Sequence, residues 1–152
     1  MITLRHDVLV IDASTGYRLF LPYQDQTSLE SMLNARRQAG CRLTAPTLWR
    51  YELTSAITKA IQLKKFTQAE ATQAFALSQA FPIDLVVPSD ELSRAAFEWT
   101  LRLKRTAAYD SFYLALAQQL QCELWTYDQR LANAVNAPWV RYLGHTAGDS
   151  AK

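Results

Sequence analysis

The segment Val8-Leu-Val-Ile-Asp12 decides the fold class of this chain. Its four apolar residues form a run that is too short for a helix, and no polar residue alternates with them. Such a run is typical of a strand that is buried on both faces of a parallel sheet. Asp12 closes the run at the carboxyl end of the predicted strand, which is the edge where open parallel sheets bind their ligands.

The rest of the chain alternates between strand and helix patterns. Short apolar segments bounded by turn residues predict further strands at 41–45, 83–87, 123–126 and 139–143. Segments with apolar residues at helical spacing predict helices at about 27–39, 46–65, 67–80, 89–105, 106–120 and 128–135. Pro46 suits the first position of its helix, and Thr67 with Glu70 forms a capping box.

This alternation predicts an α/β fold, a three-layer α/β/α sandwich around a central parallel sheet with right-handed crossovers. A chain of 152 residues is long enough to bury roughly 70% of the surface that its unfolded form exposes. We expect one domain over residues 1–143, followed by a flexible polar tail over residues 144–152.

Composition and charge narrow the possible functions. The net charge of +2 is too small for a protein that grips duplex DNA through charge alone. No apolar run reaches the ~20 residues of a membrane span, and residues 1–7 lack the apolar stretch of a secretory signal. We therefore expect a cytoplasmic protein without membrane contact, whose two cysteines, Cys41 and Cys122, are reduced.

Four acidic residues stand where a predicted strand ends or a predicted helix begins, in otherwise apolar surroundings. They are Asp12, Glu52, Asp110 and Asp128. Glu52 is the most informative, because Trp49 and Ala56 flank it at helical spacing on the helix face that must pack. A carboxylate in an apolar face must be paired, protonated or bound to a cation. No Lys or Arg stands at helical spacing to all four.

Each acid also has a structural interpretation. Asp12 could end a strand, Asp128 could cap a short helix, and the dipole at a helix start could stabilise Asp110. Their joint placement favours a shared site. Without cations, four converging carboxylates would repel each other by roughly 3 kcal/mol per pair at ~6 Å. Because His6 and His145 are the two histidines, we expect oxygen ligands, which favour Mg²⁺ or Mn²⁺.

The four acids belong to longer motifs, which follow each other along the chain. These are Val10-Ile-Asp-Ala-Ser14, Ala45-Pro-Thr-Leu-Trp-Arg-Tyr-Glu52, Ala108-Tyr-Asp-Ser-Phe-Tyr-Leu-Ala-Leu-Ala117 and Thr126-Tyr-Asp128. In order and spacing they resemble the motifs of PIN domains, and most closely those of VapC-type toxins. The resemblance covers residues 8 to about 143. It departs at Thr15-Gly-Tyr-Arg18, where the family is usually more apolar. This departure affects what the resemblance implies about helix stability and partner recognition there, and affects the metal site less.

The resemblance implies roles for individual residues and for the whole protein. Asp12, Glu52, Asp110 and Asp128 would hold the metal and act in catalysis, with Ser14 and Thr126 as supporting hydroxyls. It also implies a sheet order of 3-2-1-4-5 and cleavage of single-stranded or looped RNA. Family members are commonly homodimers that a small antitoxin protein inhibits, so both partners are expected here.

We hypothesise metal-assisted hydrolysis of a phosphodiester, in which Mg²⁺ or Mn²⁺ lowers the pKa of a bound water and orients it toward phosphorus. Five basic residues are candidate phosphate contacts, although a solvated helix end is the simpler interpretation of most: Arg50, Arg102, Lys104, Arg105 and Arg130. Trp125 and Tyr127 could stack on a base, but packing in the core or at its rim is the simpler role.

Two other classes of function compete with this hypothesis. One is a phosphotransfer domain, either a haloacid-dehalogenase-like phosphatase or a receiver. The first needs a second Asp where this chain has Ser14, and the second needs paired acids after the first strand; the sequence meets neither requirement. The other is a non-catalytic nucleic-acid-binding module of the same fold. An orphan nuclease without an antitoxin is a further alternative to a toxin.

Overall fold

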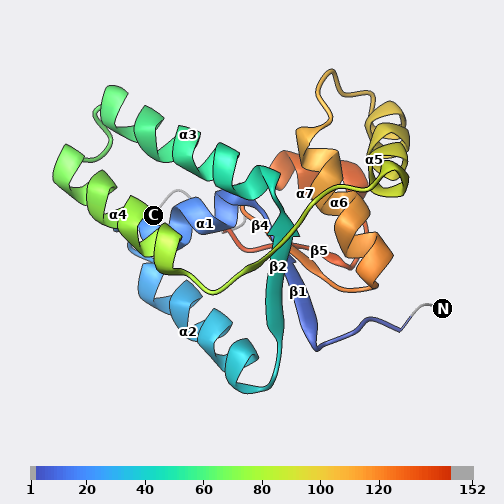
Figure 1. Ribbon diagram of the computed structural model, residues 1–152, viewed down its shortest axis with the longest axis horizontal. Helices are drawn as coiled ribbons and strands as arrows, with labels where there is room; N and C mark the ends of the chain where they lie inside the picture. Colours follow the sequence, from blue (N-terminus) through green and yellow to red (C-terminus); the bar gives the residue numbers. More distant parts are fainter. Residues whose placement is uncertain (1–2, 145–152) are drawn as a thin grey trace.

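The structure, a computed structural model, describes residues 3–144 and consists of a parallel sheet between two layers of helices (Figure 1). The strands are β1 (Val8–Ile11), β2 (Arg42–Pro46), β3 (Asp84–Val86), β4 (Leu124–Thr126) and β5 (Val140–Tyr142). The helices are α1 (Ala13–Phe20), α2 (Gln26–Gln38), α3 (Leu48–Gln62), α4 (Gln68–Ala80), α5 (Asp90–Leu103), α6 (Tyr109–Leu120) and α7 (Gln129–Val135). This arrangement confirms the predicted three-layer α/β/α sandwich.

The sheet has five strands in the order β3-β2-β1-β4-β5, and each neighbouring pair runs parallel. This is the order that the family resemblance implies. In the central strand β1, Leu9 pairs with Leu43 of β2, and Val10 pairs with Leu124 of β4. The strand order reverses between β1 and β4, because β2 and β3 lie on one side of β1, whereas β4 and β5 lie on its other side. Ligands of open parallel sheets bind at the carboxyl ends of such a pair.

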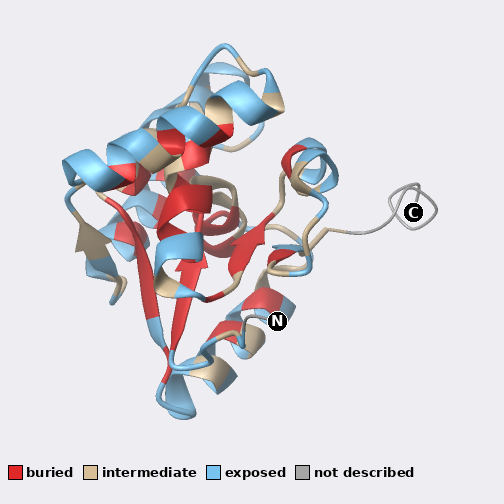
Figure 2. Cartoon of the chain, turned by 90° about the vertical axis from the view of Figure 1, so that its right-hand side faces the viewer, coloured by how far each residue is buried: buried red, intermediate tan, exposed pale blue. Residues whose placement is uncertain are grey.

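Helices α1 to α4 lie on one side of the sheet, and α5 to α7 lie on the other (Figure 1). α6 is the predicted core helix, since Tyr113 and the residues that follow it through Ala117 are buried, and it packs against β1, β2 and β4. β1 is buried along its whole length. Figure 2 shows the buried central strands in red between helices whose outer faces are exposed. The core therefore fixes the strand ends that carry two of the predicted acids.

The helix α1 forms despite the weak sequence pattern at Thr15–Arg18. Asp12 caps it, because its side chain accepts a hydrogen bond from the Thr15 N–H at 2.9 Å. Gly16 lets α1 lie directly on α3, since a Cβ at this position would come within 2.9 Å of Trp49 Cζ2. Close packing on a distant tryptophan thus supports a helix that local pattern alone predicts poorly.

Two predicted helix starts were wrong by a few residues. Pro46 is the last residue of β2, where it pairs with Val86, and α3 begins at Leu48. Proline has no N–H to donate. It fits this strand end because the hydrogen bond to Val86 O comes from the next amide, the Thr47 N–H, at 3.0 Å. α6 begins at Tyr109 rather than at residue 106 or 107. Each acid keeps its predicted place, Glu52 at the second turn of α3 and Asp110 in the first turn of α6.

The predictions about the cysteines and about membrane spans concern the described residues. Cys41 and Cys122 are free and buried, as predicted. In the described range 3–144, no helix has the length and apolar character needed to cross a membrane. Of the predicted tail over residues 144–152, the residues 145–152, which include His145, lie outside the described residues.

Candidate active site

The four predicted acids lie toward one edge of the sheet. Asp12 directly follows β1, and Asp128 follows β4 after one residue. These two strands are hydrogen-bonded neighbours at the point where the strand order reverses. Glu52 and Asp110 are placed by α3 and α6, which belong to the helical layers on opposite faces of the sheet.

A cavity of about 730 Å³ opens at this edge, and Glu52, Asp110 and Asp128 contribute to its lining. Lys104, Arg105 and Arg130 line it as well, so the cavity carries charges of both signs. Asp12 does not belong to the lining, since it is 6% exposed and buried beside the cavity. Three of the four acids therefore share one cavity, and the fourth lies in the adjacent core.

Asp12 is held by neutral donors on both of its carboxylate oxygens. Oδ1 accepts hydrogen bonds from Ser14 Oγ at 2.6 Å and from the Thr15 N–H at 2.9 Å. Oδ2 accepts a hydrogen bond from Thr126 Oγ1. A carboxylate offers about four acceptor positions. These three donors therefore leave Asp12 with one position free, on Oδ2, for a further partner.

The two supporting hydroxyls join the end of β1 to the segment after β4. Since Ser14 Oγ donates to Asp12, it can accept from the Tyr127 N–H, which lies 2.9 Å away. In the same way Thr126 Oγ1 donates to Asp12 and accepts from the Asp128 N–H at 2.9 Å. The positions of Asp12 and Asp128 are thus coupled through Ser14 and Thr126, two residues that the sequence singled out.

Asp12 and Asp128 also perform the structural roles that the sequence left open. Asp12 caps α1, and Asp128 caps α7 by accepting from the Leu131 N–H at 3.0 Å. A capping bond uses one acceptor position of a carboxylate and leaves others for a cation. Helix capping and metal binding are therefore compatible at both residues.

Glu52 is held by Tyr113, whose role the sequence reading missed. The Tyr113 hydroxyl donates to Glu52 Oε1 at 2.7 Å, from a ring that is 1% exposed. Tyr113 lies three residues after Asp110 in the buried stripe of α6. A buried tyrosine hydroxyl needs a hydrogen-bond partner, and this requirement is the signal that could have linked Tyr113 to an acid.

Asp110 has a cationic partner that helical spacing did not predict. Arg105 lies in the turn after α5, and its Nη1 is 3.1 Å from Asp110 Oδ2. Lys104 adopts the left-handed conformation, with φ 55°, at the end of α5. The backbone of this turn is held by the Arg105 N–H, which donates to Thr100 O at 3.1 Å. The side chains of the pair are 27% and 38% exposed, so solvent screens their attraction.

Burial and mutual repulsion disfavour negative charge at this edge. Burial raises the pKa of Asp12 above its usual value, against the lowering effect of its three donors. Burial also raises the pKa of Glu52, and the charges of Asp110 and Asp12 add to the rise. For Asp110, burial comes first and the charge of Asp128 second in raising the pKa, while Arg105 lowers it. A bound cation would relieve this cost in all three groups.

The donor set fits a hard divalent cation that keeps part of its water. All candidate ligands are carboxylates, and Mg²⁺ is usually bound by one or two protein carboxylates together with several waters. As the side chains stand, no three His, Cys, Asp or Glu residues within 3–144 are grouped closely enough to enclose a metal ion. The four acids thus share one region without forming a closed cage, and a cation would have to compete with Arg105 for Asp110.

The other predicted contact residues divide between the cavity and the rest of the molecule. Arg102 packs over the Trp99 ring at 4.3 Å, and Arg50 lines a separate hollow along α3 that the acids do not line. Trp125 is 1% exposed and belongs to the core, so it cannot stack on a base. Tyr127 packs at the rim, where its hydroxyl donates to Asp25 Oδ2 at 3.1 Å. Of the five basic candidates, Lys104, Arg105 and Arg130 remain as contacts of the cavity.

Comparison with known proteins adds a family to this geometry. The family model of the PIN domain matches residues 9–136. No curated protein matches the chain in sequence. Among solved structures, the crystal structure of VapC20 from Mycobacterium tuberculosis, described as a sarcin-ricin loop cleaving toxin, is similar with a TM-score of 0.63 and 12% identity. The match covers 87% of this chain and 96% of that one. At this identity, the likeness concerns the fold.

Proposed function

The chain belongs to the PIN-domain family, and on this premise we propose that it is an endoribonuclease dependent on Mg²⁺ or Mn²⁺. Its substrate would be single-stranded or looped RNA, and its reaction the hydrolysis of a phosphodiester bond. The observation that carries the proposal is the cavity beside β1 and β4, where three carboxylates and three cations form one lining. Opposite charges in one cavity suit a cation and a phosphate that bind together.

In this proposal the acids hold the metal and the water. Asp110 and Asp128 would bind the cation from the cavity side, and Asp12 would use the free position on Oδ2. When bound, the divalent cation supplies activation of water and neutralisation of charge on the phosphate. Glu52 would orient the attacking water, and Tyr113 would hold Glu52 in place through its 2.7 Å hydrogen bond.

The basic residues of the cavity would bind the substrate. Lys104 and Arg130 would contact phosphate oxygens, and Arg105 would join them once the cation has taken over Asp110. Guanidinium groups suit this role because they bind phosphate with two parallel hydrogen bonds. This local charge makes RNA binding compatible with a net charge of only +2.

We extend the proposal to the biological role. The chain would act in the cytoplasm as the toxin of a toxin–antitoxin pair, as a homodimer that a small antitoxin inhibits. This extension rests on the family and on the likeness of its fold to a toxin. A second candidate is a non-catalytic RNA-binding module. The open arrangement of the acids and the Arg105–Asp110 ion pair favour that alternative.

Cleavage assays on an RNA stem-loop and on a single strand, each with Mg²⁺, with Mn²⁺ or with EDTA, test the activity. We expect cleavage that EDTA abolishes. A melting experiment tests the metal site independently: Mg²⁺ at about 100 times its Kd should stabilise the fold by ~2.7 kcal/mol, or roughly 5–11 °C. A thermal shift without cleavage would favour the binding module. If Mg²⁺ causes no thermal shift and the RNA is not cleaved, the proposed site is refuted.

A further inference from the structure

A second cavity of about 430 Å³ adjoins the acid cavity, because Glu52 lines both. We infer that it binds the RNA strand on one side of the scissile phosphate, which rests on and deepens the proposed function. We name it the α1–α3 groove. Ser14 and Tyr17 of α1 line it together with Ala56, Lys59 and Lys65 on the side of α3.

The groove extends from the acid site along one face of α3. Glu52, Ala56, Lys59 and Leu63 line it, and their spacing of four, three and four residues places them on the same side of a helix. With a rise of 1.5 Å per residue, this row spans about 16 Å. At its inner end, Ser14 is the residue that hydrogen-bonds Asp12. An RNA strand that lies in the groove would therefore lead to the four acids.

The walls of the groove suit a nucleobase. Ala13, Ala56 and Ala60 contribute small side chains, which leave room beside the ring of Tyr17. Tyr17 is only partly buried, and it is the aromatic residue in the lining. Stacking of bases on aromatic rings within a positively charged groove is how proteins bind single strands without reading their sequence.

The charges of the groove favour a phosphate backbone over an apolar protein segment. Lys59 and Lys65 line it, and neither has an acidic partner within 4.0 Å among the ion pairs of residues 3–144. On the other side of Glu52, Lys104, Arg105 and Arg130 line the acid cavity. Cations thus lie on both sides of the acids. A single strand that crosses the site would meet positive charge before and after the scissile phosphate.

Binding of a fluorescent single-stranded RNA in EDTA tests this inference without hydrolysis. The salt dependence of the affinity counts phosphate contacts, with a slope of about −0.7 per contact for a single strand. Lys59→Gln with Lys65→Gln should therefore make the slope shallower by about 1.4. Tyr17→Leu should weaken binding roughly 5- to 150-fold, the range for loss of one stacked base.

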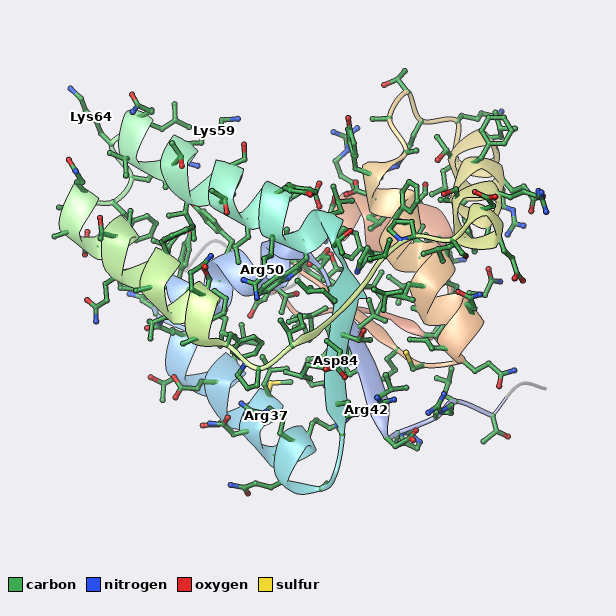
Figure 3. All side chains as sticks on the ribbon, viewed as in Figure 1. Arg37, Arg42, Arg50, Lys59, Lys64 and Asp84 are labelled. Carbon is green, nitrogen blue, oxygen red and sulfur yellow. The ribbon has the colours of Figure 1, made fainter. Side chains whose placement is uncertain are left out.

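The matched control is Arg37→Gln with Lys64→Gln, which removes the same charge outside the groove. Lys64 is the neighbour of Lys65, but it lies at the far end of α3 and points away from the molecule, and Arg37 lies on α2 (Figure 3). We expect its salt slope to equal that of the wild type. If the two double variants change the slope equally, or if neither changes it, the inference is overturned and the groove is left for a protein segment.

Failure of the inference is distinguishable from failure of the proposed function. If wild-type protein cleaves RNA with Mg²⁺ but the groove variants bind RNA normally, the groove assignment alone is wrong. If the protein binds RNA through the groove and cleaves none, the groove assignment stands and the nuclease proposal fails.

Discussion

The junction between β1 and α1 and the turn between α5 and α6 each hold an acid of the same site, yet they stabilise it by different means. At the junction, Asp12 is buried and accepts three hydrogen bonds from neutral donors. At the turn, Asp110 is partly exposed and is balanced by one long side chain, that of Arg105. The Thr15 N–H is fixed by the backbone, and the hydroxyls of Ser14 and Thr126 are on short side chains that also accept from backbone N–H groups. The Arg105 guanidinium, in contrast, is at the end of a long flexible side chain and can move away. The first region is therefore the framework of the site, and the second is its adjustable part.

The variant with the largest expected effect is Asp12→Asn, which changes the framework. Loss of the carboxylate at the framework should reduce RNA cleavage by roughly 10³-fold or more and abolish stabilisation by Mg²⁺. Circular dichroism should show the fold retained. Cleavage at the wild-type rate would refute the role of Asp12.

The same variant has a pH dependence with a defined sign. The pKa of Asp12 is raised in the folded protein, so its contribution to stability is present at low pH and is lost as the pH rises through the folded pKa. The asparagine does not titrate. Without metal, the melting temperature of the variant relative to the wild type should therefore increase with pH. A difference that stays constant from about pH 3 to about pH 8, a range that spans the titration of carboxyl groups, would contradict the direction of the shift.

Gly16→Ala strains the framework without removing an acid. The added Cβ would lie 2.9 Å from Trp49 Cζ2, and Trp49 Nε1 donates to the Asp12 carbonyl at 3.1 Å. We expect a loss of about 1–3 kcal/mol in the free energy of unfolding and weaker Mg²⁺ binding. Gly40→Ala is the control, because its cost comes from a φ of +93° and no atom lies within 4 Å of the added Cβ. It should lower stability and leave Mg²⁺ affinity unchanged.

Tyr113→Phe tests whether Glu52 belongs to the framework or to the adjustable part. Removal of the 2.7 Å hydrogen bond should cost about 1 kcal/mol of stability. It should also raise the pKa of Glu52 further, since this bond lowers it. The acid limb of the pH–rate profile should then move to higher pH. Tyr51→Phe, at a residue that is 74% exposed and outside the acid cavity, should change neither quantity.

Arg105→Gln should have the smallest effect and the opposite sign. The exposed ion pair contributes about 0–1 kcal/mol, so stability should hardly change. Near neutral pH, Mg²⁺ affinity measured by calorimetry should rise by up to roughly fivefold, because the competing cation is gone. Lys104→Gln removes the same charge from the same cavity without breaking the ion pair. Equal effects of the two variants would mean that Arg105 acts only through its general charge.

Most of the fold could be predicted from the sequence, and each failure has its own physical cause. The run at Val8–Ile11 and the core pattern around Tyr113 gave the correct element types, because burial of whole faces leaves a periodic signal. The start of α3 was missed because Pro46 is equally suited to a helix start and to the end of a strand. No bounds were predicted for the helix α1, because Gly16 owes its place to Trp49, which lies 33 residues later in the chain.

The sequence by itself determined which acids could meet, whereas the tertiary structure decided what each acid touches. Parallel strands end at one edge of a sheet, so the places of Asp12 and Asp128 follow from strand direction. Their donors do not, because Thr126 is 114 residues from Asp12 and Tyr113 is 61 residues from Glu52. The ion pair of Arg105 with Asp110 likewise depends on how one turn is closed. Such contacts arise only when packing brings distant segments together, and they leave no periodic trace along the chain.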